Sequence, residues 1–396
     1  MTSTFSFGFY GDDMDGDFDE NEVNGTTKTS QQETSTVSTL PELVKAQKHE
    51  IGAWLSTLPS QISYNTCTIF PFQEEGLEAG SSTSTGSGAK TVTVARRDVF
   101  DIRAQLMVED DAEEQNGELI TGLEKGDIAP NFYEGGFKTW ECSIDLARLV
   151  VGEGVELENE GEDGHVVELG SGTAVPSLAL FAQLLARTET GIQTTSAPTE
   201  KRRRTHFTFA DYNFAVLRLV TLPNLILTWN HFITHRNPTR PSDAPAEDEA
   251  ESKEEEMLDI TPDLLERFQS DLARRGITVA FISGAWSTSF VELVFSSPEL
   301  AGYRTLVLAS ETIYSPASLA AFSETLLALL RRSSSGGSVS RALVAAKKVY
   351  FGVGGGVDEF LAVLRSVAGG DVGVEERMDV RFAGVGRMIL EVRSSK

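Results

Sequence analysis

The sequence has 396 residues, of which 40% are hydrophobic, and a net charge of −25. A chain of this length can bury a core without disulfides or a structural metal, and its two cysteines, Cys67 and Cys142, form no CxxC pair. The strong negative charge argues against broad binding to nucleic acid, because the phosphate backbone would repel it. A basic partner is therefore expected.

The negative charge is concentrated in four segments, residues 1–40, 108–118, 153–163 and 243–256. Together they carry a net charge of −26, so the rest of the chain is close to neutral. The acidity is therefore expected in tails and loops, outside the folded core.

Neither a signal peptide nor a membrane span is expected. The N-terminus has no basic flank before an apolar run, and the most apolar stretch, 217–229, is interrupted by Arg218, Pro223 and Asn224. The few cysteines suit a reducing, intracellular compartment. A cytoplasmic and nuclear location is expected. The run Lys201–Arg204 could be a nuclear-import signal, although a solvated loop before the next strand explains it more simply.

The first 126 residues divide into a tail and an extension. Residues 1–38 combine acids with a Ser/Thr/Gln tract and cannot bury enough apolar surface to order themselves, so a disordered acidic tail is expected. Residues 39–126 are expected to form an extension. It should contain a short helix within 40–58, a Gly/Ser loop at 74–90 and a strand in 91–108, TVTVARRDVFDIRAQLMV.

From Gly164 onward, short β-rich runs alternate with helical stretches, which predicts a parallel sheet wrapped by helices. The expected strands are 165–170, 205–210, 277–283, 304–310 and 347–353, and the expected helices are 175–187, 213–229, 262–275, 316–332 and 357–367. Two further runs, 376–383 and 386–393, are too close together for a crossover and predict an antiparallel hairpin. The predicted class is a doubly wound α/β fold with a seven-strand sheet and a C-terminal antiparallel hairpin, in a domain over 127–396 with insertions at 188–204 and 236–260.

The strongest local signal is the run 166–176, VVELGSGTAVP, in which an apolar strand passes through a Gly-x-Gly turn into a helix. Gly170 and Gly172 let the backbone turn tightly and approach a ligand, and the free N–H groups at the helix start favour a polar or negatively charged group. Val175 replaces the third glycine of the dinucleotide fingerprint, so hydride chemistry with a nicotinamide cofactor is poorly supported. A purely structural turn remains the alternative.

Asp211 ends the next expected strand, where an acid would bind the hydroxyl groups of a ribose. Alone, Asp211 or Asn213 would more often cap a helix, but the preceding glycine turn favours the binding role. His231 and His235 are one helical turn apart, yet no third ligand has a fitting spacing, so no metal is expected. Hydrolase and NTPase functions lack support, because neither a Gly-x-Ser-x-Gly elbow nor a P-loop occurs.

The fold class, the glycine turn and the acid after the second strand together resemble the seven-strand, class I S-adenosylmethionine-dependent methyltransferases. More specific runs resemble the fungal histidine protein methyltransferase family, and these are 135–142 (GGFKTWEC), 168–176, 211–213 (DYN), 221–224 (TLPN), 282–286 (ISGAW) and 310–314 (SETIY). The opening FSFGF followed by acids is also similar to the start of its fungal members. The resemblance covers about residues 127–395.

The resemblance implies a cofactor site with parts that cover the cofactor, lie under its methionine portion, hold its ribose, border its adenine and lie near the reacting end. Trp140, with Glu141 and Cys142, would cover the cofactor, and Gly170 and Gly172 would lie under its methionine portion, with Glu168 also expected among the cofactor-binding residues. Asp211 would hold the ribose, with Tyr212 and Asn213 beside it. Gly284, Ala285 and Trp286 would border the adenine, and Ser310 would lie near the reacting end. Glu311 and Tyr314 match the acid-x-x-Tyr motif that faces the substrate. Each residue also has a simpler interpretation: Trp140 and Trp286 as core aromatics, Cys142 as a buried filler, and Glu311 as a helix cap.

The resemblance implies that a neutral histidine imidazole in a large-subunit ribosomal protein accepts the methyl group of S-adenosylmethionine. Glu311 or another acid would orient the ring through its other N–H or accept that proton after the transfer, and the orienting role is favoured. A lysine-directed methyltransferase on the same fold is the nearest alternative, because cofactor motifs do not report the acceptor. A non-catalytic ribosome-assembly module that keeps the cofactor fold would also carry these motifs, whereas Val175 disfavours a dinucleotide oxidoreductase.

Overall fold

A computed structural model of the chain describes residues 44–72, 91–109, 120, 135–153, 163–194, 203–235, 256–334, 340–351, 354–381 and 384–394. The acidic tail expected at 1–38 lies outside the described residues, as do residues 195–202 and 236–255 of the two expected insertions. All described residues belong to one unit, Leu43–Lys396.

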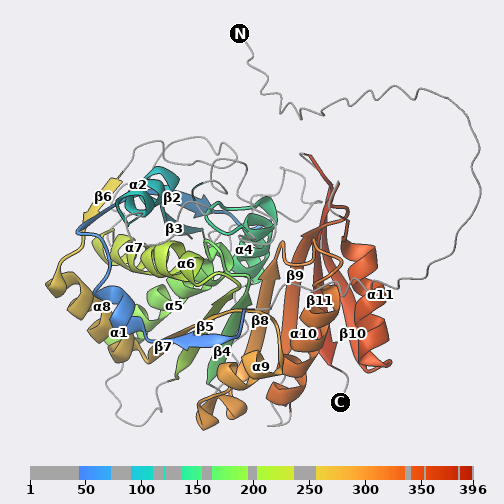
Figure 1. Ribbon diagram of the computed structural model, residues 1–396. Coiled ribbons are helices and arrows are strands. Elements are labelled where there is room, and N and C mark those ends of the chain that lie inside the picture. Colours follow the sequence, from blue (N-terminus) through green and yellow to red (C-terminus); the bar gives the residue numbers. More distant parts are fainter. Residues whose placement is uncertain are drawn as a thin grey trace, which may run out of the picture. The chain divides into compact units, whose positions relative to one another are not determined.

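An eight-stranded sheet forms the centre of this unit (Figure 1). In spatial order its strands are β1 (Gln47–His49), β7 (Ile277–Ser283), β5 (Thr205–Asp211), β4 (Gly164–Leu169), β8 (Arg304–Ser310), β9 (Arg341–Lys347), β11 (Arg387–Ser394) and β10 (Val372–Val380). Strands β7, β5, β4, β8 and β9 run parallel, and β11 and β10 form an antiparallel hairpin at one end. The predicted doubly wound sheet with its hairpin is confirmed, and β1 adds an unexpected eighth strand, antiparallel to β7.

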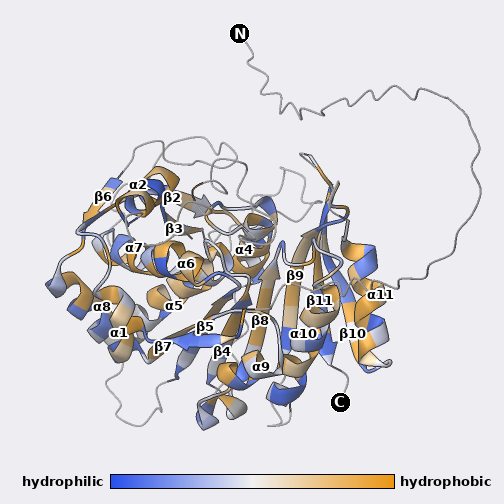
Figure 2. Cartoon of the chain, viewed as in Figure 1, coloured by the Kyte–Doolittle hydropathy of each residue, from blue (hydrophilic) through white to orange (hydrophobic). Residues whose placement is uncertain are grey.

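Helices cover both faces of the sheet. The side chains buried on one face include residues of α4 (Glu141–Glu153), α5 (Val175–Thr194), α7 (Leu222–Thr234) and α8 (Pro262–Arg275), and those on the other include residues of α9 (Thr288–Val294), α10 (Leu319–Ser334) and α11 (Val357–Ala368). Val166 packs on the first face and Val167 on the second. Because both faces are covered, the central strands are almost continuously hydrophobic (Figure 2), which is why the sequence located them.

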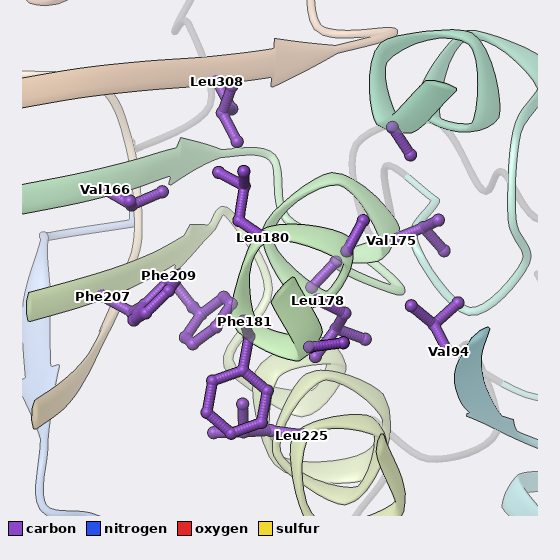
Figure 3. Packing of buried hydrophobic residues seen from close by; sticks show 14 of the residues in the cluster. Val94, Val166, Val175, Leu178, Leu180, Phe181, Phe207, Phe209, Leu225 and Leu308 are labelled. Atoms are coloured by element: carbon purple, nitrogen blue, oxygen red, sulfur yellow. The ribbon is translucent and has the colours of Figure 1, made fainter. Parts of the chain in front are cut away.

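The core under α5 fixes the turn that joins β4 to this helix (Figure 3). The ring of Phe181 on α5 lies edge-on to Phe207, 6.0 Å away, and Phe207 stacks on Phe209 at 6.1 Å. Leu178 is fully buried in the same cluster. Burial of each such side chain stabilises the fold by about 1.5–3 kcal/mol, so the start of α5 is held firmly above β4 and β5.

A second, three-stranded antiparallel sheet is formed by β3 (Val92–Arg97), β2 (Gln61–Ile69) and β6 (Glu256–Asp259). Strand β6 lies at the end of the insertion expected at 236–260, so the last residues of that insertion are part of a sheet. Strand β3 packs on α7, and β2 packs on α4. The N-terminal extension is therefore joined to the α/β domain by both main-chain pairing and side-chain packing.

The single strand predicted over 91–108 is wrong in its second half. Strand β3 ends at Arg97, and Asp98 accepts a hydrogen bond of 2.7 Å from the N–H of Phe100, which opens helix α2 (Val99–Glu109). Ile102 and Leu106 are fully buried and four residues apart, as on one face of a helix. The short helix predicted within 40–58 is divided between strand β1 and helix α1 (Ile51–Leu55).

The strand predicted over 347–353 is also misplaced, because β9 covers 341–347 instead. The apolar run of 342–346 is buried from both faces, whereas Val349 and Phe351 are exposed. Helix α5 continues to Thr194, beyond its predicted end at 187. The helix predicted over 213–229 is divided into α6 (Phe214–Val216), a π-helical segment (Leu217–Thr221) and α7, and a 3-10 turn (Pro298–Gly302) precedes β8.

Candidate active site

The expected site residues lie at the carboxyl ends of the parallel strands. Gly170 follows β4, Tyr212 follows β5, Gly284 follows β7 and Glu311 follows β8. The strand order reverses beside β4, and doubly wound sheets bind their ligands at this edge. The fold therefore brings four separate sequence motifs to one edge of the sheet.

The turn between β4 and α5 requires glycine at two positions. Gly170 and Gly172 have φ angles of 64° and 50°, which disfavour other residues. A Cβ atom on Gly170 would lie 2.7 Å from Cγ2 of Thr312, and one on Gly172 would lie 3.3 Å from Cα of Gly136. The turn thus approaches the acid-x-x-Tyr motif on one side and the segment before α4 on the other.

Asp211 is held against this turn. Its Oδ2 atom accepts a hydrogen bond of 3.1 Å from the N–H of Gly172, and its Oδ1 atom accepts one of 3.0 Å from the N–H of Asn213. Its carbonyl oxygen accepts a bond of 3.1 Å from the N–H of Gly284. The carboxylate is therefore fixed at the turn, in the position expected to bind a ribose.

Side chains from the π-helical segment and α7 support the turn from the opposite side. The hydroxyl of Thr221 donates to the carbonyl of Gly172 at 2.7 Å, and Nδ2 of Asn224 donates to the carbonyl of Thr173 at 3.0 Å. The Oδ1 atom of Asn224 accepts a hydrogen bond of 2.7 Å from the N–H of Arg97 on β3. One asparagine therefore connects the N-terminal extension to the glycine turn, a role that the sequence did not reveal.

Glu168 lies on β4 and is only 1% exposed. Its Oε2 atom accepts a hydrogen bond of 3.1 Å from the N–H of Ser177, while its Oε1 atom has no hydrogen-bond partner within the described part of the chain. Burial raises the pKa of Glu168 to about 8, against the hydrogen bonding of Ser177, which lowers it. The side chain is therefore mostly protonated at pH 7. An unpartnered polar atom beside the glycine turn fits a cofactor with polar groups.

The turn after β7 is covered by the N-terminal segment. The N–H of Ala285 donates to the carbonyl of Val44 at 2.9 Å, so this segment lies beside the position expected for the adenine. Trp286 packs edge-on against Phe290 at 5.2 Å and Phe322 at 6.3 Å, the core role of the simpler interpretation. Its contact with the cofactor stays a prediction.

A second group of expected residues is centred on Glu311, whose side chain is 10% exposed. The hydroxyl of Tyr350 donates a hydrogen bond of 2.6 Å to Oε2 of Glu311, and the N–H of Glu311 donates to the carbonyl of Ala345 at 3.0 Å. Glu311 has a φ of 56°, a left-handed conformation that costs a residue other than glycine about 1–3 kcal/mol and is most often found at functional sites. The contacts with β9 and Tyr350 thus hold a strained acid at the site edge.

Lys347, the last residue of β9, joins Glu311 to the start of α4. Its Nζ atom lies 3.6 Å from Oε1 of Glu311, 3.0 Å from Oε2 of Glu141 and 5.2 Å from the centre of the Trp140 ring. Burial by itself would lower the pKa of Lys347, but the two carboxylates outweigh it and raise that pKa, so the ammonium stays charged. Burial, together with Glu311, raises the pKa of Cys142, which keeps its sulfur as a thiol.

The remaining expected residues are near these groups. Ser310 pairs with Ala345 where β8 and β9 end. The ring of Tyr314 lies edge-on to that of Tyr350, with 6.3 Å between their centres. Tyr212 is partly buried, and Nδ2 of Asn213 is buried without a hydrogen-bond partner among the described residues. Sequence analysis missed Lys347 and Tyr350 as site residues, because no motif marks either residue and their role depends on elements that meet only in the fold.

Two other features of the described ranges bear on function. They include no helix that is both long enough and apolar enough to cross a membrane. They also hold no group of three or more His, Cys, Asp or Glu side chains arranged to bind a metal ion. The rings of His231 and His235 stack on each other, with 4.2 Å between their centres.

Solved structures that are similar to this chain at low sequence identity include several methyltransferases. The rRNA methyltransferase aviRa from Streptomyces viridochromogenes is 14% identical, with a TM-score of 0.32 over 67% of this chain and 88% of that chain. A putative methyltransferase complexed with SAH is 11% identical, with a TM-score of 0.31 over 66% of this chain and 52% of that chain. No family model matches the sequence.

Curated relatives are much more similar in sequence. Histidine protein methyltransferase 1 of Saccharomyces cerevisiae is 38% identical over 277 residues, which are 68% of this chain and 68% of the relative. Histidine protein methyltransferase 1 of Schizosaccharomyces pombe is 33% identical over 363 residues, 92% of this chain and 85% of the relative. The Mus musculus homolog is 32% identical over 59% of this chain and 50% of its own length. The chain therefore belongs to the histidine protein methyltransferase family.

Proposed function

We propose that this protein transfers a methyl group from S-adenosylmethionine to an imidazole nitrogen of a histidine in a large-subunit ribosomal protein. Family membership supports a histidine acceptor. The contact that carries the proposal lies between Gly170 of the glycine turn and Thr312, the residue after Glu311. This contact supports the proposal, because the turn expected to bind the cofactor approaches the residue next to the acid expected to face the substrate.

The residues present fit the cofactor. Gly170 and Gly172 give close access to the backbone, Asp211 is fixed for a ribose, and Glu168 offers an unpartnered buried oxygen. S-adenosylmethionine supplies a methyl group bonded to a positively charged sulfur. This sulfur is a good leaving group, so the transfer needs no added acid. The protein therefore has mainly to hold the acceptor in line and to exclude water.

Glu311 is the group that can orient the acceptor. A histidine side chain is largely neutral at pH 7, because its unperturbed pKa is about 6.5, and it then carries one N–H and one lone pair. Donation of that N–H to Glu311 directs the lone pair of the other nitrogen away from the carboxylate, toward the methyl group. Tyr350 and Lys347 keep Glu311 in place for this role.

The ribosomal substrate and the location are further parts of the proposal. A net charge of −25, gathered in four segments, favours a basic protein as partner. A cytoplasmic and nuclear location suits an enzyme that modifies ribosomal proteins. Within the Lys201–Arg204 run, Arg204 is engaged with Asp163 at 3.0 Å and Glu299 at 2.6 Å, while Lys201 and Arg202 lie outside the described residues.

The test is transfer of labelled methyl from S-adenosylmethionine to an extract of cells lacking the protein, followed by hydrolysis to single amino acids. We expect methylhistidine from one large-subunit ribosomal protein. Asp211→Ala should abolish the transfer, and Asp263→Ala, at an exposed position on α8, should not. Methyllysine in place of methylhistidine would mean that the acceptor is a lysine. Cofactor binding without any methyl transfer would favour a non-catalytic binding module.

A further inference from the structure

The groups around Lys347 are those that bind an alkylammonium ion. The face of an aromatic ring and nearby carboxylates attract such cations. Here the ring of Trp140 lies 5.2 Å from the Lys347 ammonium, and the carboxylates of Glu141 and Glu311 lie 3.0 Å and 3.6 Å from it. We call Trp140, Glu141 and Glu311 the cation cage. Its occupant is a lysine of the chain itself.

Lys347 is fixed in this position by the sheet. It ends β9 and pairs with Arg387 on β11, while Ala345, two residues earlier, accepts the main-chain hydrogen bond of Glu311. Its side chain is 18% exposed. The Lys347 side chain thus reaches the cation cage from the end of β9, and only a small part of it is accessible to solvent.

An occupied cage treats two kinds of acceptor differently. A substrate lysine carries its own ammonium, which would meet the positive charge of Lys347 and find both carboxylates already paired. A neutral imidazole meets no such repulsion. A carboxylate offers about four acceptor positions, so Glu311 keeps acceptor capacity for an imidazole N–H beside its contacts with Tyr350 and Lys347.

We propose that Lys347 is a specificity-determining residue, which fills the cation cage and thereby excludes cationic acceptors while leaving Glu311 able to hold a neutral imidazole. The proposal rests on the proposed function, because it takes Glu311 to face the acceptor. It assigns to Lys347 more than the structural role of tying β9 to α4, and the two roles predict different ligand binding.

The test measures ligand affinity and needs no methyl transfer. Full-length protein loaded with S-adenosylhomocysteine is titrated with n-butylammonium, which resembles a lysine side chain, and with 1-butanol, its uncharged counterpart. The variants are Lys347→Met, which removes the charge, and Lys347→Arg, which keeps it. Lys348→Met is the matched control, because the neighbouring Lys348 pairs with Asp379 at 2.6 Å, outside the cage.

Lys347→Met should bind n-butylammonium at least about 10-fold more tightly than the wild type, with no equal gain for 1-butanol. No preference for n-butylammonium over 1-butanol is expected in the wild type, Lys347→Arg or Lys348→Met. If Lys347→Met gains no preference for the cation, or gains equally for 1-butanol, Lys347 is only structural and the proposal is overturned. Lys347→Gln serves the same comparison if the Met variant does not fold.

This outcome is separate from that of the methyl-transfer assay. A protein that transfers no methyl group can still show an emptied cation cage, and an active histidine methyltransferase can fail the butylammonium test. Once the modified histidine is known, its peptide and the same peptide with lysine in place of histidine give a second comparison. The lysine peptide should inhibit Lys347→Met about 10-fold more strongly than the wild type.

Discussion

Residues with the clearest functional geometry combine strain, burial and charge in one place. Glu311 is held in a left-handed conformation, with Tyr350 on one carboxylate oxygen and Lys347 near the other. The motif identified Glu311 and Tyr314 from sequence. Lys347 and Tyr350 could not be found that way, since their role depends on β8, β9 and α4 meeting in space.

Replacing Glu311 by glutamine tests whether its charge serves the reaction. Glu311→Gln keeps the shape but turns an acceptor-only carboxylate into an amide, so the acceptor imidazole is held less well. We expect kcat to fall about 100-fold, while affinity for S-adenosylmethionine changes by less than about threefold. Steady-state kinetics and calorimetric binding measure the two effects.

Tyr350→Phe is the graded control for that experiment, because it removes the 2.6 Å hydrogen bond that orients Glu311, together with the 3.3 Å bond that the hydroxyl accepts from the N–H of Lys347. It should lower kcat by about 10-fold, since one hydrogen bond contributes roughly 0.5–1.5 kcal/mol. Full activity and unchanged cofactor affinity in Glu311→Gln would show that another carboxylate holds the acceptor.

At the scale of helices and strands, periodicity and composition predicted the central strands, which are buried between the two layers of helices. The strands β5, β7 and β8 and the helix α8 lie within one residue of their predicted ends. Strands β1 and β6 were not predicted, because they are short, lie at sheet edges and pair with distant partners. Strand β2 was also missed, although it has 9 residues and is central in its sheet. The motifs on the cofactor side could be predicted, because the need for glycine in a turn depends on the local backbone and not on distant partners.

The glycine turn depends on Asn224 of α7, which bonds both Thr173 and the N–H of Arg97. Asn224→Ala leaves a buried donor and a buried acceptor without partners, which should lower the free energy of unfolding by about 2–4 kcal/mol. It should also weaken binding of S-adenosylmethionine, because the turn loses its support. Urea unfolding and calorimetric binding measure the two effects. Asn230→Ala, on the same helix, is the control, and equal cofactor affinity in both variants would contradict the role of Asn224.

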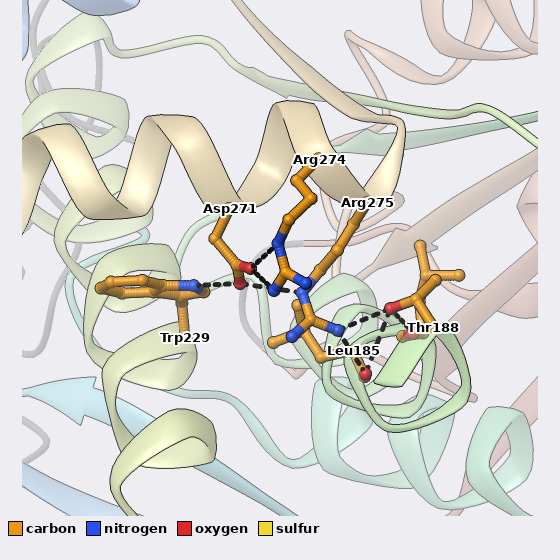
Figure 4. A network of polar contacts seen from close by, with 7 residues as sticks. Leu185, Thr188, Trp229, Asp271, Arg274 and Arg275 are labelled. Carbon is orange, nitrogen blue, oxygen red and sulfur yellow. Dashed lines mark hydrogen bonds and ion pairs between the residues drawn. The ribbon is translucent and has the colours of Figure 1, made fainter. Parts of the chain in front are cut away.

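Helices α5, α7 and α8 are connected by a buried polar network (Figure 4). Asp271 accepts hydrogen bonds from the indole N–H of Trp229 at 2.9 Å and from Nε of Arg275 at 2.8 Å. Arg275 is 1% exposed and also donates to the carbonyl of Leu185 at 2.8 Å and to the hydroxyl of Thr188 at 2.7 Å. The network thus ties the C-terminal end of α8 to α5 and α7.

Asp271→Ala should lower the free energy of unfolding by about 3–5 kcal/mol, because it leaves the guanidinium of Arg275 buried without a counter-charge. Denaturant unfolding monitored by circular dichroism measures the loss. Adding Arg275→Met to this variant should recover part of the stability, since no unpaired charge then remains. A loss below about 1 kcal/mol in the single variant would mean that solvent reaches Arg275.

For the whole molecule, the buried His165 and the partly buried His206 predict how stability depends on pH. His165 on β4 and His206 on β5 are paired in register, with 5.2 Å between their ring centres. Burial lowers the pKa of both side chains, and that of His206 falls to about 4, with Lys48 adding to the effect. The unfolded chain therefore binds protons below about pH 6.5 that the folded chain does not bind.

The free energy of unfolding should accordingly fall as the pH is lowered from 7 toward 4. Between pH 7 and pH 5, His206→Asn should lose about 1–2 kcal/mol less than the wild type, because it cannot take up this proton when it unfolds. Urea unfolding at the two pH values gives the comparison. The same loss in both proteins would mean that His206 titrates normally in the folded state.

The central claim is that the chain methylates a histidine of a large-subunit ribosomal protein. The most direct measurement incubates large ribosomal subunits from cells lacking the protein with the purified protein and S-adenosylmethionine, and then locates new methyl groups by peptide mass spectrometry. The account predicts that one peptide gains a single methyl group and that fragmentation places it on a histidine. A methyl group on lysine, or no gain on any ribosomal protein, would contradict it.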